Sequence, residues 1–197
     1  MLKIANKTLS DQFPLVMGIL NITPDSFYDG GKITDITSAL LRTGEMIKHG
    51  ALIIDAGGCS TRPGAEEVPE AEEIKRTAPV IKAIKKEFPD VIISIDTYRA
   101  AVAKEAIKNG ADIINDISGG TIDPGIFNIA VEYKVPYVLT HIKGTPKDMQ
   151  VDPQYDDVTN EVFSFFENKI AELRKKGIEQ IILDPGFGFG KNSQHNY

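Results

Sequence analysis

The sequence predicts an α/β fold of parallel strands and helices, a (β/α)8 TIM barrel truncated after the sixth strand. Short apolar runs rich in branched residues alternate with longer amphipathic runs about six times. The short runs are apolar on both faces, as in buried parallel strands. A polar residue follows every run, whereas a doubly wound sheet, the alternative architecture, concentrates such residues at one switch point. These three observations favour the barrel.

The elements follow one another with few interruptions. Residues 1–14 are mixed in character and fit a small hairpin or cap. The predicted strands share an apolar, branched composition and cover residues 15–20, 51–54, 91–95, 111–114, 136–139 and 180–183. The predicted helices share an apolar stripe of helical period and cover residues 35–48, 70–87, 99–108, 124–134 and 157–176. Asp35 is the expected N-cap of the first helix, and Pro79 is expected to bend or shorten the second.

Composition limits the class of protein. The chain has 197 residues, of which 42% are hydrophobic and 25% charged, which suits a single domain over residues 1–197. The net charge of -6 argues against a general nucleic-acid binder but not against an anionic small substrate, because one loop can be locally basic. One cysteine excludes an internal disulfide. Without an apolar signal core or a membrane-length run, we expect a cytoplasmic protein with neither nucleic-acid nor membrane partners.

Polar side chains stand where the predicted strands end, and parallel strands would bring them to one rim. They are Asn21, Asp55, Asp96, Asn115, His141 and Asp184. Any one of the acids and amides alone is better explained as a cap of the next helix, and His141 alone as a packed side chain. Buried acids and amides need partners, however, and a flat, nitrogen-rich heterocycle would supply them. Asp184 could accept two parallel N–H bonds from an amino-pyrimidine edge, while Asp96 and Asn115 serve other ring atoms.

The loops predict a second chemistry, the binding of an anion and a cation. Thr61 and Arg62 follow a double glycine after the second strand, and a guanidinium suits phosphate or carboxylate oxygens. The glycine-rich residues 186–190 could hold an anion too, with Lys191 adding charge. The amide oxygen of Asn21 suits a hard cation such as Mg2+, which keeps most of its waters and bridges substrate phosphates. The glycine spacing fits neither a dinucleotide site nor a nucleotide-hydrolase loop.

Five motifs together resemble the dihydropteroate synthase family of pterin-binding enzymes. They are Asn-Ile-Thr-Pro-Asp-Ser-Phe at 21–27, Asp-x-Gly-Gly-x-Ser-Thr-Arg-Pro-Gly at 55–64, Ser-Ile-Asp-Thr at 94–97, Asn-Asp-Ile at 115–117 and Asp-Pro-Gly-Phe-Gly-Phe-Gly-Lys at 184–191. The resemblance implies a barrel that joins p-aminobenzoate to 6-hydroxymethyl-7,8-dihydropterin diphosphate and releases diphosphate in folate synthesis. It also implies a homodimer and a target of sulfonamides.

The resemblance assigns roles to individual residues. It implies that Asn21 binds Mg2+ and that Thr61 and Arg62 act in catalysis, on a loop that orders the diphosphate and covers p-aminobenzoate. The substrate-binding residues that it implies are Asp55, Thr61, Arg62, Pro63, Asp96, Asn115, Asp184, Gly188 and Phe189. Two other readings remain: a pterin-binding module without catalysis, and a methyltetrahydrofolate-binding barrel of the corrinoid methyltransferases.

The sequence departs from the family pattern in two places. Thr140 stands where the family usually has a methionine that packs on the pterin face, so stacking there is expected to be weaker. A later lysine, arginine and histidine of the family, which bind the substrates and the diphosphate, would lie beyond Tyr197. We therefore expect the 197 residues alone to be inactive.

Overall fold

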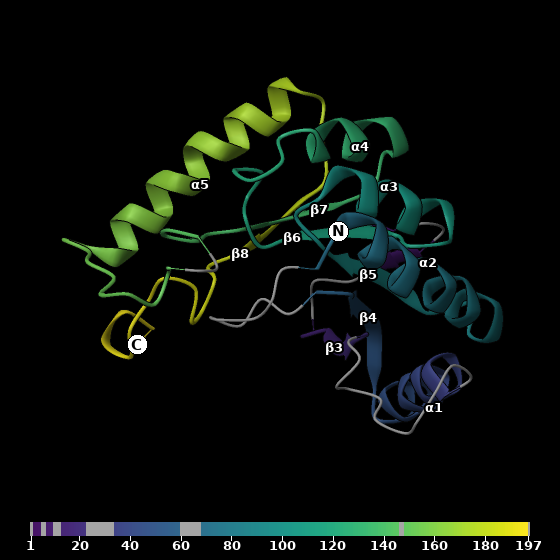
Figure 1. Cartoon of the computed structure of the whole chain (residues 1–197). Coiled ribbons are helices and arrows are strands. Elements are labelled where there is room, and N and C mark those ends of the chain that lie inside the picture. Colours follow the sequence, from purple (N-terminus) through teal and green to yellow (C-terminus); the bar gives the residue numbers. More distant parts are fainter. Residues whose placement is uncertain are drawn as a thin grey trace.

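The computed structural model describes residues 2–4, 7–9, 13–22, 34–59, 68–145 and 148–196. One sheet of six parallel strands has its strands in chain order (Figure 1). The strands are β3 (Val16–Asn21), β4 (Ala51–Gly57), β5 (Ile92–Asp96), β6 (Ile113–Asp116), β7 (Tyr137–Thr140) and β8 (Ile181–Asp184). This uninterrupted order is that of a barrel wall, because a doubly wound sheet reverses its order at the switch point.

The helices lie on the outer side of the sheet, in an arc from α1 round to α5 (Figure 1). Their bounds in the described residues are α1 (Thr34–Lys48), α2 (Glu70–Glu87), α3 (Ala100–Lys108), α4 (Ile126–Tyr133) and α5 (Val158–Lys175), with a short 3-10 turn, η2 (Gln194–Asn196). The described part of the sheet ends at the edge strands β3 and β8. Six strands of a barrel are therefore present, as predicted. No helix of the described residues is long and apolar enough to cross a membrane.

The structure differs from two local expectations about where the helices begin and end. Helix α1 begins at Thr34, so Asp35 lies inside it instead of capping it. Helix α2 runs its full predicted length with Pro79 inside it, so the proline does not shorten the helix. Pro79 is exposed, and water can bond the carbonyl that loses its amide partner there. The last helix was predicted from residue 157, and there the Asp157 side chain caps it by accepting from the amide of Asn160.

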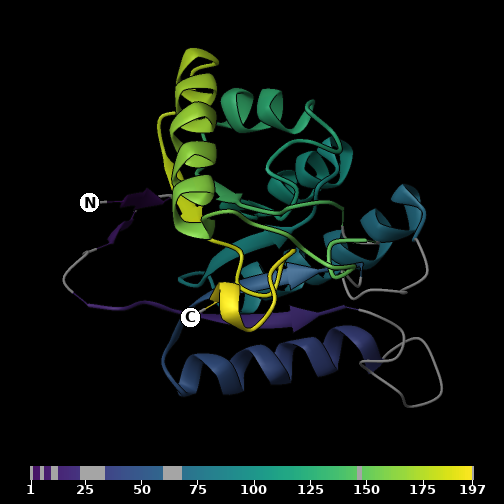
Figure 2. The same cartoon turned by 90° about the vertical axis from the view of Figure 1, so that its left-hand side faces the viewer.

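A hairpin fills the amino-terminal end of the barrel. Strands β1 (Leu2–Ile4) and β2 (Lys7–Leu9) pair antiparallel, as the mixed character of the first residues suggested. Ile4 and Leu9 are buried in one cluster with inward side chains of the sheet. Those side chains are Ile53, Ile92, Ile113 and Val138. Figure 2 shows the hairpin on the side where the strands begin, so the opposite, carboxyl-terminal end is the one left for a ligand.

The larger core lies between the sheet and the helices. Alternate strand residues such as Ile54, Ile93 and Leu139 point outward and are buried with the apolar faces of the helices. Phe166 and Leu173 of the predicted stripe of α5 belong to this core. Because side chains alternate along each strand, the outer core fixes which residues face the barrel interior. The residues two positions after the inward side chains that pack on the hairpin therefore also point inward. They are Asp55, Ser94, Asn115 and Thr140.

Candidate functional site

The parallel register brings the predicted strand-end residues to one rim. Asn21 lies beside Gly57, Gly57 beside Asp96, and Asp96 beside Asn115. On the far strands, Thr140 lies beside Asp184. Strand β4 is longer than predicted and continues through Asp55 to Gly57, so Asp55 lies inside its strand, one layer below the rim.

Asp55 and Asn115 are joined inside the barrel. The Asn115 amide donates from Nδ2 to Asp55 Oδ2 at 2.9 Å. Asp55 is only 5% exposed. Four buried oxygens of this inward layer, Asp55 Oδ1, Ser94 Oγ, Asn115 Oδ1 and Thr140 Oγ1, have no hydrogen-bond partner among the described residues. A buried polar atom without a partner carries a free-energy cost, so this arrangement suits a ligand that brings N–H donors.

Negative charge accumulates beside this pair. Burial raises the pKa of Asp96 well above its usual range, and the nearby carboxylates of Asp55, Glu73 and Asp116 raise it further. Burial also raises the pKa of Asp55, although the nearby hydroxyl of Ser94 and the amide of Asn115 partly offset the effect. A ligand with N–H donors or positive charge would relieve both carboxylates.

Asp116, although adjacent to Asn115, belongs to a different structure. Its carboxylate accepts from the amides of Ser118 and Gly120 and from the hydroxyl of Tyr137 at 2.7 Å, on the helix-facing side of the sheet. Two of these partners lie in the turn after β6 and the third in the next strand, so Asp116 holds that turn in place. It has no face toward the barrel interior.

Asp184 ends β8 and begins the glycine-rich loop. Its Oδ1 accepts from the amide of Gly186 at 2.8 Å. Gly186 has φ of 67°, and a Cβ there would lie 2.0 Å from the carbonyl oxygen of His141, so only glycine fits this close approach. Gly188 is exposed and Phe189 half-buried at the rim.

His141 is a packed side chain, not a rim residue open to ligand. It is buried, and its ring meets Phe165 of α5 edge-on at 4.9 Å. Burial lowers the pKa of His141 to about 4, and the charge of Lys191 contributes. The structure therefore favours the packing interpretation for this residue, with a neutral ring.

The sequence suggested that Lys191 adds positive charge to an anion site, but its side chain is buried and points into the protein. The side chain is only 5% exposed because the chain folds back after Gly190. Its amine lies against His141 Nδ1 at 2.9 Å and against three backbone carbonyls. Burial lowers the pKa of Lys191 to about 8.

Sequence reasoning missed a buried cluster around Glu73 of α2. Glu73 is 1% exposed and accepts from Thr97 Oγ1 at 2.7 Å and Arg99 Nη1 at 2.6 Å. The available signal was an acid one turn before Thr77 on the apolar face of α2, in register with the buried positions. Thr97 directly follows Asp96, so the cluster fixes the end of β5.

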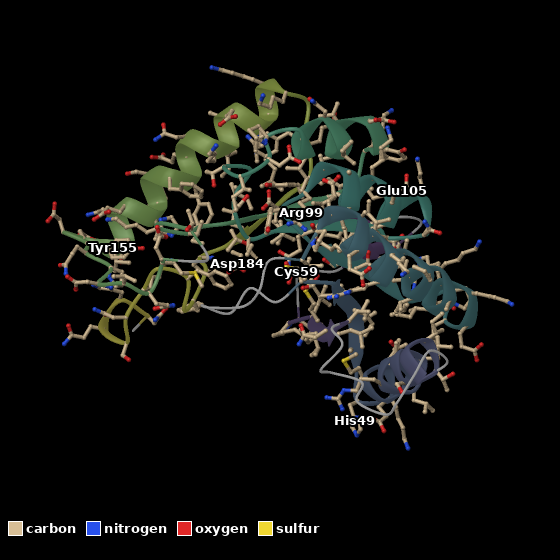
Figure 3. The ribbon with its side chains drawn as sticks, viewed as in Figure 1. His49, Cys59, Arg99, Glu105, Tyr155 and Asp184 are labelled. Atoms are coloured by element: carbon tan, nitrogen blue, oxygen red, sulfur yellow. The ribbon has the colours of Figure 1, made fainter. Side chains whose placement is uncertain are left out.

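Arg99 of this cluster and the neighbouring Arg76 of α2 each contact one flank of residues 60–67. Arg99 Nη1 donates to the carbonyl of Val68 at 2.7 Å, and Arg76 Nη1 to that of Gly58 at 3.4 Å. Figure 3 marks Arg99, Cys59 and Asp184, which come from the start of α3 and the ends of β4 and β8. Thr61, Arg62 and Pro63 lie outside the described residues, as does the motif after Ile22.

Asn21 has the features expected of a weak magnesium ligand. Its side chain is exposed at the end of edge strand β3. Within the described residues, no cluster of three or more His, Cys, Asp or Glu side chains could hold a metal ion. One amide oxygen with open surroundings still fits Mg2+, which keeps several waters and takes substrate phosphate oxygens.

The wall of parallel strands is plugged at its amino-terminal end, and unpartnered oxygens of Asp55 and Asn115 lie near its carboxyl-terminal end, which defines the chain as a protein of the α/β-barrel class. Residues 17–197 match the family model described as pterin binding enzyme. The chain belongs to the pterin-binding enzyme family.

Known relatives agree with this assignment. The chain is 49% identical over 183 residues to a dihydropteroate synthase of Synechocystis, a match that covers 92% of this chain and 63% of the relative. The Yersinia pestis dihydropteroate synthase, solved with a sulfonamide drug complex, has a TM-score of 0.91 and 46% identity over 100% of this chain and 71% of that one. The Xanthomonas albilineans enzyme with 4-aminobenzoic acid has a TM-score of 0.85 and 38% identity over 95% and 66%. These structures confirm the barrel fold.

Proposed function

We propose that this protein is a dihydropteroate synthase, a transferase of folate synthesis that joins 6-hydroxymethyl-7,8-dihydropterin diphosphate to p-aminobenzoate. The observation that carries the proposal is the set of partnerless oxygens of Asp55 and Asn115 beside Asp96. A pterin ring presents several N–H groups, which match these acceptors. The chain spans 63% of its Synechocystis relative, so the activity is proposed for the intact protein.

In this reaction the amine nitrogen of p-aminobenzoate attacks the pterin methylene carbon, and the carbon–oxygen bond to the diphosphate breaks. We assign Asp96, Asn115 and Asp184 to the pterin, with Asp55 holding Asn115 in place at 2.9 Å. Carboxylates around the ring stabilise positive charge that develops on the pterin as the bond breaks. The neutral aromatic amine needs no general base, so no histidine or carboxylate is required beside it.

The remaining roles stay with residues at the rim. We assign Thr61, Arg62 and Pro63 to the diphosphate and p-aminobenzoate, with Thr61 and Arg62 acting in catalysis, because a guanidinium matches phosphate oxygens. Gly188 and Phe189 would line the p-aminobenzoate side. Sulfonamide binding follows from the same assignment, since the Yersinia pestis relative carries such a drug.

Asn21 would hold Mg2+ through its exposed amide oxygen, together with waters and diphosphate oxygens. The ion would supply charge neutralisation to the departing diphosphate. The homodimer and the cytoplasmic location stay predictions. Size-exclusion chromatography with light scattering tests the first, and fractionation of cells tests the second.

The decisive experiment supplies the intact protein with both substrates and measures release of diphosphate and formation of 7,8-dihydropteroate. We expect turnover that requires Mg2+ and that a sulfonamide inhibits. Pterin binding without turnover would favour the non-catalytic module instead. Binding of methyltetrahydrofolate without use of p-aminobenzoate would favour the corrinoid methyltransferase barrel.

A further inference from the structure

Lys191 closes a cage made from its own loop and the end of strand β7. Its Nζ lies 2.9 Å from His141 Nδ1, 3.1 Å from the Gly186 carbonyl and 3.2 Å from the Phe189 carbonyl. A fourth acceptor, the carbonyl of His141, is at 3.4 Å. An ammonium has three donors and no acceptor, so this amine is fully occupied by the protein and has no donor left for a ligand.

The groups that the amine contacts are those that shape the proposed ligand site. The amide of Gly186 donates to Asp184 Oδ1, and the amide of His141 donates to the Asp184 carbonyl at 2.9 Å. Lys191 contacts the other side of both residues, through their carbonyls. Gly186 and His141, which hold Asp184 through their amides, are therefore both held by one amine through their carbonyls.

The outer side of the loop has partners of its own. The Tyr155 hydroxyl donates to the Gly190 carbonyl at 2.8 Å, and Gln150 donates to the Gly188 carbonyl. The amide of Gly188 donates to Asn196 Oδ1 at 3.0 Å. These contacts hold the exposed half of the loop, whereas Lys191 is the contact that joins its buried half to β7.

We propose that Lys191 is a positioning residue, which sets the Asp184 carboxylate and the Phe189 ring in the geometry that binds the pterin and p-aminobenzoate. The inference rests on the proposed function, because it takes Asp184 and Phe189 as substrate-binding residues. The amine binds the carbonyls of Gly186 and Phe189, which flank and include the proposed ligand contacts, so its loss would loosen the site itself.

The test is the affinity of the intact protein for 6-hydroxymethyl-7,8-dihydropterin, measured by calorimetry in the wild type and in Lys191→Met. Methionine has similar length without a donor, so the carbonyls lose their partner. We expect pterin binding at least tenfold weaker, with faster hydrogen exchange at the amides of residues 186–189. Lys82→Ala, which truncates an exposed lysine of α2, is the matched control and should change affinity less than twofold.

Rescue separates positioning from plain stability. In Lys191→Ala, added propylammonium can refill the cage and should restore most of the lost affinity, whereas tetramethylammonium, which has no N–H donor, should not. Lys191→Gln, which keeps two donors, should bind with intermediate affinity and serves if the methionine variant does not fold. If the wild type binds the pterin and the variants bind it within twofold of the wild type, with unchanged hydrogen exchange at residues 186–189, the role of Lys191 is overturned and the proposed function is not. A wild type that binds no pterin would overturn the proposed function and, with it, this role for Lys191.

Discussion

Asn115 and Asp55 form a hydrogen bond of 2.9 Å inside the barrel, and each keeps one buried side-chain oxygen without a partner in the described chain. The bond joins β6 to β4 across β5, so it spans three strands of the wall. It places two acceptor atoms at a fixed distance from each other before any ligand arrives. Preorganised acceptors of this kind are what recognition of a rigid heterocycle requires.

Asn115→Ala should therefore affect both folding and binding. The substitution removes the amide donor from Asp55, which stays buried, and an unsatisfied buried group costs about 1–3 kcal/mol. We expect the free energy of unfolding in urea to fall by that amount, and pterin affinity to fall at least tenfold. Asn128→Ala on the exposed side of α4 is the control. Equal effects of the two variants would remove the assignment of Asn115 to the pterin.

The Asp96 carboxylate predicts a dependence of stability on pH. Its pKa is raised in the folded state, chiefly by burial, so the folded protein binds more protons than the unfolded chain above pH 3.8. The stability that this group contributes at low pH is lost as the pH rises through its folded-state pKa. Asp96→Asn should remove this loss, so the variant gains stability over the wild type as pH increases, and at pH 7 it should bind pterin more weakly.

The measurement for Asp96 is urea unfolding at several pH values in both proteins, together with a pterin titration at pH 7. Asp90→Asn, at an exposed carboxylate, should leave pterin affinity within twofold. If Asp96→Asn is less stable than the wild type at neutral pH, the buried charge of Asp96 does not destabilise the folded protein, whatever the variant's pterin affinity.

The order of helices and strands could be predicted from the sequence. The contacts that decide whether a polar residue binds a ligand or packs inside the protein could not. The succession of parallel strands correctly predicted that Asp96 and Asn115 lie side by side at one rim, because both stand at the ends of neighbouring strands. His141 and Lys191 could not be placed, since their roles depend on how the loop after β8 folds back onto β7. Glu73 was missed for a similar reason: its partners Thr97 and Arg99 are more than twenty residues away.

His141 predicts a change of stability with the opposite sign to that of Asp96. Burial and the charge of Lys191 lower its pKa from 6.5 to about 4, so between these values the unfolded chain binds more protons. The contribution of His141 to stability should rise with pH across this window and be lost below it, by at most about 3 kcal/mol. Urea unfolding of the wild type and of His141→Asn from pH 4 to 7 measures this contribution as the difference between the two proteins. The charged neighbours of the ring, Lys191, Lys143 and Glu161, are present in both. A difference that falls with pH would mean that the ring is charged in the folded protein.

Glu73→Ala should be among the most destabilising single changes in this chain. It would leave Arg99 and Thr97 without their buried acceptor, and removal of one partner from a buried ion pair costs about 3–5 kcal/mol. Chemical denaturation measures this loss. Glu72→Ala removes the neighbouring, more exposed pair with Arg76 and should cost less than about 1 kcal/mol. Similar losses in the two variants would show that the Glu73 cluster does not hold the end of β5.

Gly58 is a residue whose identity the structure explains by close contact with α2. A Cβ there would lie 2.7 Å from Thr77 Cγ2 and 3.1 Å from Glu73 Cγ, with both side chains buried. Gly58→Ala should push α2 away from the end of β4, and overpacking of this kind costs about 1–3 kcal/mol. Gly44→Ala in α1 is the matched control, since its nearest neighbour is 3.4 Å away on the ring of Phe88 and alanine favours helix by about 0.5–1 kcal/mol. Thermal and urea unfolding of both variants should therefore shift in opposite directions, and a Gly58→Ala protein as stable as the wild type would mean that the helix yields without cost.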